Sequence, residues 1–245
     1  MERKSVYGRQ SLHSRRADGL ASLALTAMSP APLTVEIWSD VACPWCYLGK
    51  RRLESALERF DRRDEVEVIW RSFQLQPDAP RFGEPGAGAP TSEYLAARFS
   101  PAQIEEMQGR LTALAAADGL DYHLDQGKVG NTFEAHVLIH AAARQGFGDA
   151  MVERLFKAQH VEGLRLDDPA VLAELAAEVG LDGAAATPNA ADRQAVGEEI
   201  EAAGQIGISG VPFFLFDRRL AVSGAQPSEL LLEGLKQAAE AGSPA

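Results

Sequence analysis

The feature that most constrains this chain is its pair of cysteines, the only two in 245 residues, which occur together as Cys43-Pro44-Trp45-Cys46. Residues 33–38 before the pair are apolar and β-branched, which is typical of a strand. Residues 47–57 after it have the apolar spacing of an amphipathic helix. The cysteines therefore lie where a strand turns into a helix, and we expect that junction to begin a strand–helix–strand unit.

The local sequence also predicts how the helix begins. Pro44 suits the first helical position, where a backbone N–H is not needed. Cys43 then becomes the N-cap, with its sulfur near free backbone N–H groups and the positive end of the helix dipole. A thiol in that position loses its proton readily, and the thiolate is the reactive form. Cys46 lies one turn further along, within disulfide reach of Cys43, so the pattern predicts a redox-active dithiol.

Two other uses of a cysteine pair are disfavoured. A structural zinc site needs about four ligands, and the chain has no third cysteine. An inert structural disulfide would close too short a loop to restrain the unfolded chain much. The histidines show no ligand spacing to the pair; they are His13, His123, His136, His140 and His160. His136 and His140 are four residues apart, but no glutamate of a zinc-protease motif lies between them. We expect no metal.

Composition and charge exclude several kinds of partner. The chain has 24 lysines and arginines against 35 aspartates and glutamates, a formal net charge of −11. Such an acidic balance argues against a nucleic-acid partner. No apolar stretch approaches the length of a membrane span, so no membrane partner is expected. A hydrophobic content of 46% and a charged content of 24% are ordinary for a globular protein.

The N-terminal segment, residues 1–32, differs from the rest because basic residues dominate it as far as residue 27. We expect it to be a disordered tail, or to lie upstream of a true translation start at Met28. A twin-arginine export signal is the other interpretation, since Arg15-Arg16 precedes an apolar run. That run is short, and no clean cleavage site follows it.

The remaining sequence divides into three parts. Residues 33–76 read as strand, helix and strand, with the second strand over 66–75, so these two strands should be parallel. Residues 77–205 form a helical insertion that begins with a Pro- and Gly-rich loop. Residues 206–242 read as strand, strand and helix, with strands over 208–216 and 220–222. Helices are predicted in the insertion over 100–119, 131–146, 149–163, 168–180 and 187–204.

Three of those helices have clear start signals in the form of a capping residue followed by proline. They are Ser100-Pro101, Asp168-Pro169 and Thr187-Pro188. Glycines near positions 119, 180 and 204 are expected to end the same three helices.

A second candidate part of the site is Val211-Pro212, far along the chain from the cysteines. Proline within a strand pattern belongs at the first residue or on an edge. A cis peptide bond before Pro212 fits as well, because cis bonds are nearly confined to proline. The residues alone leave both interpretations open.

Four segments together resemble the thioredoxin superfamily, and within it the DsbA-like family and its FrnE-type branch. They are residues 39–50 around the cysteines, Phe73-Gln74-Leu75-Gln76-Pro77, residues 131–136 (Asn-Thr-Phe-Glu-Ala-His), and Gly210-Val211-Pro212-Phe213-Phe214. The resemblance covers residues 33–239. It implies an α/β, thioredoxin-like βαβ–ββα fold with an inserted all-helical subdomain.

The resemblance also implies roles at the site. Cys43 would be the nucleophile, Cys46 would resolve the mixed disulfide, and Pro212 would be cis and pack against the pair. The backbone of Val211 would then pair with an extended substrate as an added strand. Asn131 and His136 would approach the substrate cleft.

Four further residues near the motif are candidates. Pro44 and Trp45 separate the cysteines and are expected to contact substrate. Phe73 is expected to shape an apolar substrate surface with Trp45, although core packing is its simpler role. Asp40 is either a proton acceptor during resolution or a turn residue that caps the loop before the helix.

These features predict a protein disulfide oxidoreductase or isomerase that acts on protein, peptide or small-molecule thiols and disulfides in the cytoplasm. Its only redox group would be the Cys43–Cys46 disulfide, with no other cofactor, and glutathione or a thioredoxin-like partner would recycle it. The direction of exchange stays open, because the helix end favours the thiolate and desolvation by Trp45 opposes it.

Two other functions were weighed. Kappa-type glutathione transferases and hydroxychromene carboxylate isomerases share this arrangement but carry serine in place of Cys43. The other is a non-redox binding or chaperone-like role.

Overall fold

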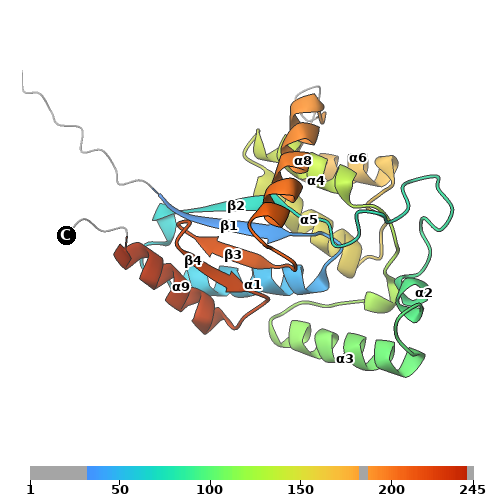
Figure 1. The fold of residues 1–245 in the computed structure, drawn as a ribbon, viewed down its shortest axis with the longest axis horizontal. Coiled ribbons are helices and arrows are strands. Elements are labelled where there is room, and N and C mark those ends of the chain that lie inside the picture. Colours follow the sequence, from blue (N-terminus) through green and yellow to red (C-terminus); the bar gives the residue numbers. More distant parts are fainter. Residues whose placement is uncertain (1–31, 182–186, 242–245) are drawn as a thin grey trace, which may run out of the picture. The chain divides into compact units, whose positions relative to one another are not determined.

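The computed structural model describes residues 32–181 and 187–241. The predictions for the N-terminal tail and for a start at Met28 lie outside the described residues. Four strands form one sheet in the order β2-β1-β3-β4 (Figure 1). They are β1 (Leu33–Ser39), β2 (Val66–Ser72), β3 (Phe213–Phe216) and β4 (Leu220–Ser223). β1 pairs parallel with β2, whereas β3 runs antiparallel to both β1 and β4.

The helices and strands occur along the chain in the predicted order. The helices are α1 (Pro44–Glu58), α2 (Thr91–Ala96), α3 (Pro101–Ala117), α4 (Phe133–Ala143), α5 (Gly148–His160), α6 (Pro169–Glu178), α8 (Ala190–Gln205) and α9 (Ser228–Ala241). Short 3₁₀ turns lie at Arg63–Glu65 and Leu124–Gln126. The chain therefore runs βαβ, then helices, then ββα, and the predicted α/β fold is confirmed. No helix of the described residues is long and apolar enough to cross a membrane.

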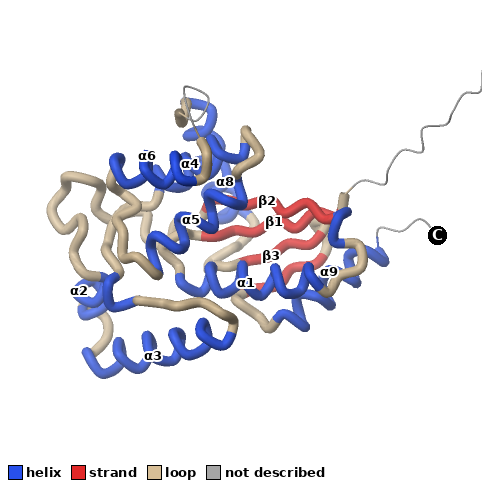
Figure 2. The backbone as a smooth tube through the Cα atoms, turned by 180° about the vertical axis from the view of Figure 1, so that it is seen from behind, coloured by secondary structure: helices blue, strands red, loops and turns tan. Residues whose placement is uncertain are grey.

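The two faces of the sheet are covered by different helices. α1 and α9 lie against one face of the sheet (Figure 2). Val35 and Ile37 point to this face and are completely buried there. Glu36 and Trp38, which alternate with them, point to the opposite face, across which α8 runs. This alternation is the period of two of a strand with a helix layer on each side.

The helical insertion has its own apolar core, which continues into the start of α1. α5 contributes several completely buried side chains to this core, among them Met151, Leu155 and Phe156. The cysteines, Tyr47 and Leu48 of α1 belong to the same buried cluster. The insertion is thus packed directly against the cysteine end of α1.

Two of the three predicted helix caps are confirmed. Ser100 caps α3 with a capping box to Gln103, and the Asp168 side chain accepts the Ala170 N–H at the start of α6. The prediction for Thr187-Pro188 is wrong, because α8 begins at Ala190 with Asn189 as its N-cap. The Asn189 side chain satisfies two free N–H groups of the first turn, which decides the start.

Two strands are shorter than predicted, and one short helix was not predicted. β2 stops at Ser72, because its partner β1 stops at Ser39; the Phe73 N–H makes a last bond to the Ser39 carbonyl, and the Leu75 N–H donates to the Asp40 carboxylate. β3 begins at Phe213 rather than at 208, because the Ile208 N–H donates to the Ala203 carbonyl and closes α8. The short helix α2 was not predicted as a separate element.

Candidate active site

The two cysteines lie at the beginning of α1. Cys43 is the N-cap, with φ −89° and ψ 110°, and Pro44 occupies the first helical position, so the predicted helix start is confirmed. The Cys46 N–H donates to the Cys43 carbonyl over 3.0 Å, which places both thiols on the first turn. Both cysteines are free thiols in this structure.

The Val211-Pro212 loop lies against this turn. The Cys43 thiol faces the Val211 carbonyl, with an Sγ–O distance of 3.7 Å, and the peptide bond between Val211 and Pro212 is cis. The Pro212 ring packs on Gly49, where an added Cβ would lie only 2.9 Å from Pro212 Cγ. The sheet brings the two segments together, because the end of β1 is paired with the beginning of β3.

Both cysteines of the motif are almost completely buried. Cys43 is 4% exposed and Cys46 1%, whereas the Trp45 side chain between them is 40% exposed. Burial raises the pKa of Cys46 well above its usual range, and the Cys43 sulfur raises it further, whereas the Ser39 hydroxyl opposes the rise. Cys46 is therefore held as a protonated thiol, and it needs a proton acceptor before it can act as a nucleophile.

Asp40 holds the loop that leads into Cys43. Its Oδ1 accepts the Ala42 N–H over 3.1 Å, and its Oδ2 accepts the Leu75 N–H over 2.8 Å. The carboxylate is 1% exposed and thereby ties the end of β1 to the segment after β2. This is the arrangement of a loop-capping residue, and the role of proton acceptor stays a prediction.

Asn131 and His136, at the beginning of α4, are both buried. The Asn131 side chain donates to the Pro77 carbonyl over 2.9 Å and accepts the Phe133 N–H over 3.0 Å, so it fixes the loop after β2. His136 Nε2 lies 3.5 Å from Asp40 Oδ1, behind the cysteine loop. Substrate contact by either side chain stays a prediction.

Phe73 is half-buried and belongs to a small apolar cluster on the α8 side of the sheet. The buried members of that cluster include Trp38 and Ile208, and Val211 packs against it as well. Phe73 therefore supports the loop that faces Cys43. Contact between Phe73 and substrate stays a prediction.

The structure adds contacts that sequence reasoning missed. The Tyr122 hydroxyl donates to the Pro44 carbonyl over 2.6 Å. Tyr47 stacks on Phe156, with ring centroids 5.1 Å apart. His160 Nε2 lies 3.0 Å from the Val41 carbonyl, and burial lowers the pKa of His160 to about 4, so the ring is neutral and donates this bond. Of these residues, only Tyr47 lies next to the cysteine motif in the sequence, so the motif itself gave no signal for the others.

A buried lysine also joins α1 to α5. Lys50 is 3% exposed and contacts Glu54, Glu153 at 3.0 Å and Asp149 at 3.4 Å. Burial alone would lower the pKa of Lys50, but the three carboxylates outweigh it and raise the pKa. The cluster fixes the cysteine helix to α5 of the helical insertion, and its member Asp149 also accepts the Trp70 indole N–H of β2 over 3.0 Å.

Among residues 32–181 and 187–241, no group of three or more His, Cys, Asp or Glu side chains is placed to hold a metal ion. His140, four residues after His136, instead contacts Glu199 of α8 at 2.9 Å.

A dithiol on the first turn of a helix, opposite a proline loop and at the end of a β2-β1-β3-β4 sheet, defines a thioredoxin-fold domain. The chain belongs to the family of DSBA-like thioredoxin domains, which it matches over residues 34–236.

Individual proteins agree with this assignment. A probable DsbA oxidoreductase from Streptomyces coelicolor is 38% identical, with a TM-score of 0.79 over 87% of this chain and 92% of that one. The cytosolic disulfide reductase DsbM from Pseudomonas aeruginosa, solved with GSH, has the same fold at 23% identity, with a TM-score of 0.57 over 85% of this chain and 100% of that one. The uncharacterized protein YwbO of Bacillus subtilis is 29% identical over 150 residues, 61% of this chain and 68% of its own length.

Proposed function

We propose that this protein is a thiol–disulfide oxidoreductase that works through the Cys43-Pro44-Trp45-Cys46 dithiol. The observation that carries the proposal is the asymmetry of the two thiols. Cys43 caps the helix and faces the Val211 carbonyl, whereas Cys46 lies one turn deeper and has a raised pKa. An outer nucleophile and an inner resolving thiol are what disulfide exchange needs.

The exchange then has two steps. The Cys43 thiolate attacks one sulfur of a substrate disulfide, which forms a mixed disulfide and releases the other substrate sulfur as a thiolate. Cys46 loses its proton and attacks the Cys43 sulfur, which forms the Cys43–Cys46 bond and expels the second substrate thiolate. The reverse sequence oxidises a substrate dithiol.

Peptide or protein disulfides are the proposed substrates. Trp45 and Leu75 are exposed apolar side chains on two segments that Asp40 holds together, and they provide a surface for an extended apolar peptide. The Val211 carbonyl beside Cys43 is a backbone acceptor that such a peptide could bond.

Glutathione is the recycling partner to test first, since the similarly folded disulfide reductase of P. aeruginosa was solved with GSH. A thioredoxin-like protein is the other candidate, and we propose a cytoplasmic setting for either.

The decisive experiment is equilibration of the wild-type protein with glutathione buffers, followed by tryptophan fluorescence. A reduction potential near about −270 mV would indicate a reductase, and one above about −200 mV an oxidant or isomerase. Cys43→Ser should abolish exchange, whereas Cys46→Ser should accumulate a mixed disulfide that mass spectrometry detects. Full exchange activity in Cys43→Ser would refute the proposal.

The same variants separate the alternatives. A kappa-type transferase or chromene carboxylate isomerase carries serine at this position, so its activity should survive Cys43→Ser. A binding or chaperone-like protein should show no rapid thiol exchange in the wild type.

A further inference from the structure

A small cavity with a polar wall lies beside Ser39, at the end of the strand that leads to the cysteines. The Ser39 hydroxyl lines this cavity and has no hydrogen-bond partner among the described residues, and it opposes the rise in the pKa of Cys46. The cavity measures about 10 Å³, and its other polar walls come from Ser72 and His136. Its size and polar groups suit a single water molecule.

His136 is the titratable group at this cavity. Its ring is 2% exposed, and its Nε2 has no hydrogen-bond partner among the described residues. A buried polar atom left without a partner is costly, so such an atom next to a cavity points to a bound water. The nearest charged oxygen, Asp40 Oδ1, lies 3.5 Å from the same nitrogen.

We propose that His136 accepts the proton of Cys46 through the Ser39 hydroxyl and one water in this cavity, an inference that rests on the proposed function. The Cys46 S–H bond breaks as the Ser39 hydroxyl and the water each pass on a proton, and an N–H bond forms at His136 Nε2. The Cys46 thiolate then forms the disulfide with Cys43, and the substrate sulfur leaves with the bonding electron pair.

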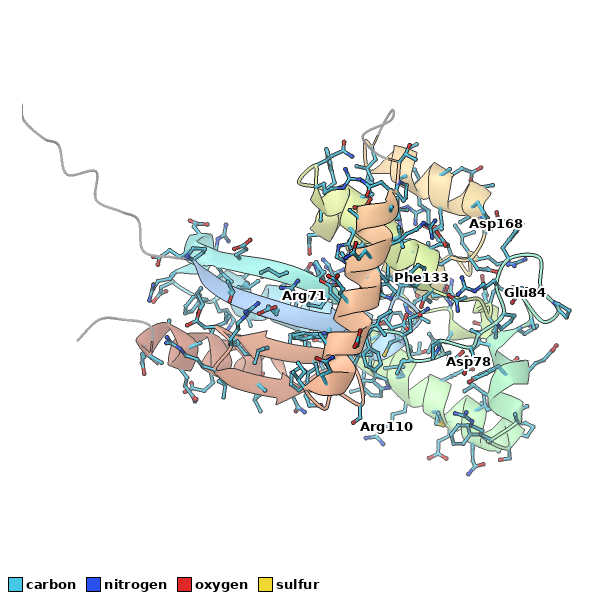
Figure 3. All side chains as sticks on the ribbon, turned by 45° about the horizontal axis from the view of Figure 1, so that its top comes forward. Arg71, Asp78, Glu84, Arg110, Phe133 and Asp168 are labelled. Carbon is cyan, nitrogen blue, oxygen red and sulfur yellow. The ribbon has the colours of Figure 1, made fainter. Side chains whose placement is uncertain are left out.

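The charges around His136 favour this transfer. The Asp40 carboxylate is the counter-ion for a protonated ring, and its oxygens already accept two backbone N–H groups, which leaves the imidazole better placed to take the proton. Arg71, which is labelled in Figure 3, also lines the cavity, but its guanidinium is paired with Glu36 and Glu199.

Two further histidines complete the surroundings of His136. His160 contacts the Val41 carbonyl of the loop that contains Asp40, and it is neutral because burial lowers its pKa to about 4. His140 lies one turn along α4 from His136 and contacts Glu199 at 2.9 Å.

The cavity also has a route to solvent. The Ser72 hydroxyl lies 3.3 Å from His140 Nε2, and His140 contacts Glu199. His140 and Glu199 line an open groove on the α8 side of the sheet. A proton received at the cavity can leave through this groove.

The test separates the two steps in time. Reduced protein is mixed with the aromatic disulfide dithiobis(nitrobenzoate), and the coloured thiolate is followed by stopped flow. The first release reports attack by Cys43, and the second reports resolution by Cys46. In His136→Gln, the second phase should slow by about tenfold or more, because a positioned base contributes at least that much. The first phase should be unchanged.

The pH profile of the second phase is the readout that a merely structural role would not move. Wild type should show a titration that His136→Gln lacks, and the exposed control His123→Gln should behave as wild type. Ser39→Ala should slow the second phase as well, and it decides the question if His136→Gln does not fold. An unchanged second phase in Ser39→Ala and in a folded His136→Gln overturns this inference. Absence of the first phase in wild type overturns the proposed function instead.

Discussion

The two halves of α1 belong to different parts of the molecule. The first half, with both cysteines, Tyr47 and Leu48, lies in the core of the helical insertion. The second half, with Leu53 and Ala56, lies in the core between the sheet and α9. The reactive end of the helix is thus packed by the insertion, and the other end is anchored by the thioredoxin-like layers. Stability depends on both halves, but thiol chemistry should depend on the first alone.

The largest loss of stability should come from removing a large buried side chain from either core. Phe156→Ala removes the ring on which Tyr47 stacks, and Leu235→Ala removes a buried side chain of α9. Both should lower the free energy of unfolding by about 2–5 kcal/mol, measured by urea titration. Only Phe156→Ala should also change the rate of the first coloured release. An equal rate change in Leu235→Ala would show that the two halves are not separate.

His160 should make the stability of the cysteine end depend on pH. Its pKa lies near 4 in the folded protein against an ordinary value of 6.5, so the unfolded chain binds the extra proton between these values. The free energy of unfolding is therefore highest above pH 6.5. It falls as the pH drops towards 4, because the unfolded chain gains a proton that buried His160 does not, and the total loss is about 3 kcal/mol. Urea unfolding across this range should show the slope in wild type and a smaller one in His160→Phe. The exposed control His123→Phe should keep the wild-type slope.

Gly49→Ala should disturb the contact between α1 and the proline loop. The new Cβ would lie 2.9 Å from Pro212 Cγ and 3.2 Å from Phe214 Cζ, so the loop must move. We expect a loss of about 1–3 kcal/mol in stability and a changed rate of attack by Cys43.

The matched control is Gly109→Ala on α3, where no atom lies within 4 Å of the added Cβ. It should stabilise the protein by about 0.5–1 kcal/mol, because alanine favours a helix interior. Stabilisation by Gly49→Ala as well would contradict the tight packing of Pro212.

The smallest loss of stability is expected from a substitution at Arg52, in the middle of α1. Arg52 donates to Asp118 after α3 over 2.8 Å and to the Ala225 carbonyl before α9 over 2.7 Å. It therefore contacts both the helical insertion and the thioredoxin-like part. Arg52→Met should cost about 1 kcal/mol in thermal unfolding, with unchanged thiol kinetics. A change in the second coloured release would mean that the two halves communicate through Arg52.

Local signals predicted the parts of the fold that local contacts decide. The helix start at Cys43 and the caps Ser100 and Asp168 depend on residues within one turn, and the structure confirms them. The start of α8 could not be chosen from the sequence, since Thr187 and Asn189 are both good capping residues and geometry favours Asn189. The strand ends depend on partners far along the chain.

The site shows the same division. The dithiol was visible in the sequence, but its surroundings come from distant segments. Tyr122 reaches the Pro44 carbonyl from 78 residues away, and His160 reaches the Val41 carbonyl from 119. Neither residue carries a local signal, because a tyrosine or histidine in an amphipathic region reads as ordinary packing. Resemblance to a family, rather than spacing, joined Val211 and Pro212 to the cysteines.

The distance along the chain between Cys43 and Val211 has a consequence for synthesis. The two residues are 168 positions apart, and β3, which follows Val211, is also the second neighbour of β1. A ribosome adds about 5–20 residues per second, so roughly 10 to 30 seconds pass between the two. Throughout that interval the nascent dithiol has no facing loop, and β1 has one open edge. The growing chain carries a reactive thiol pair before it carries a site that selects partners.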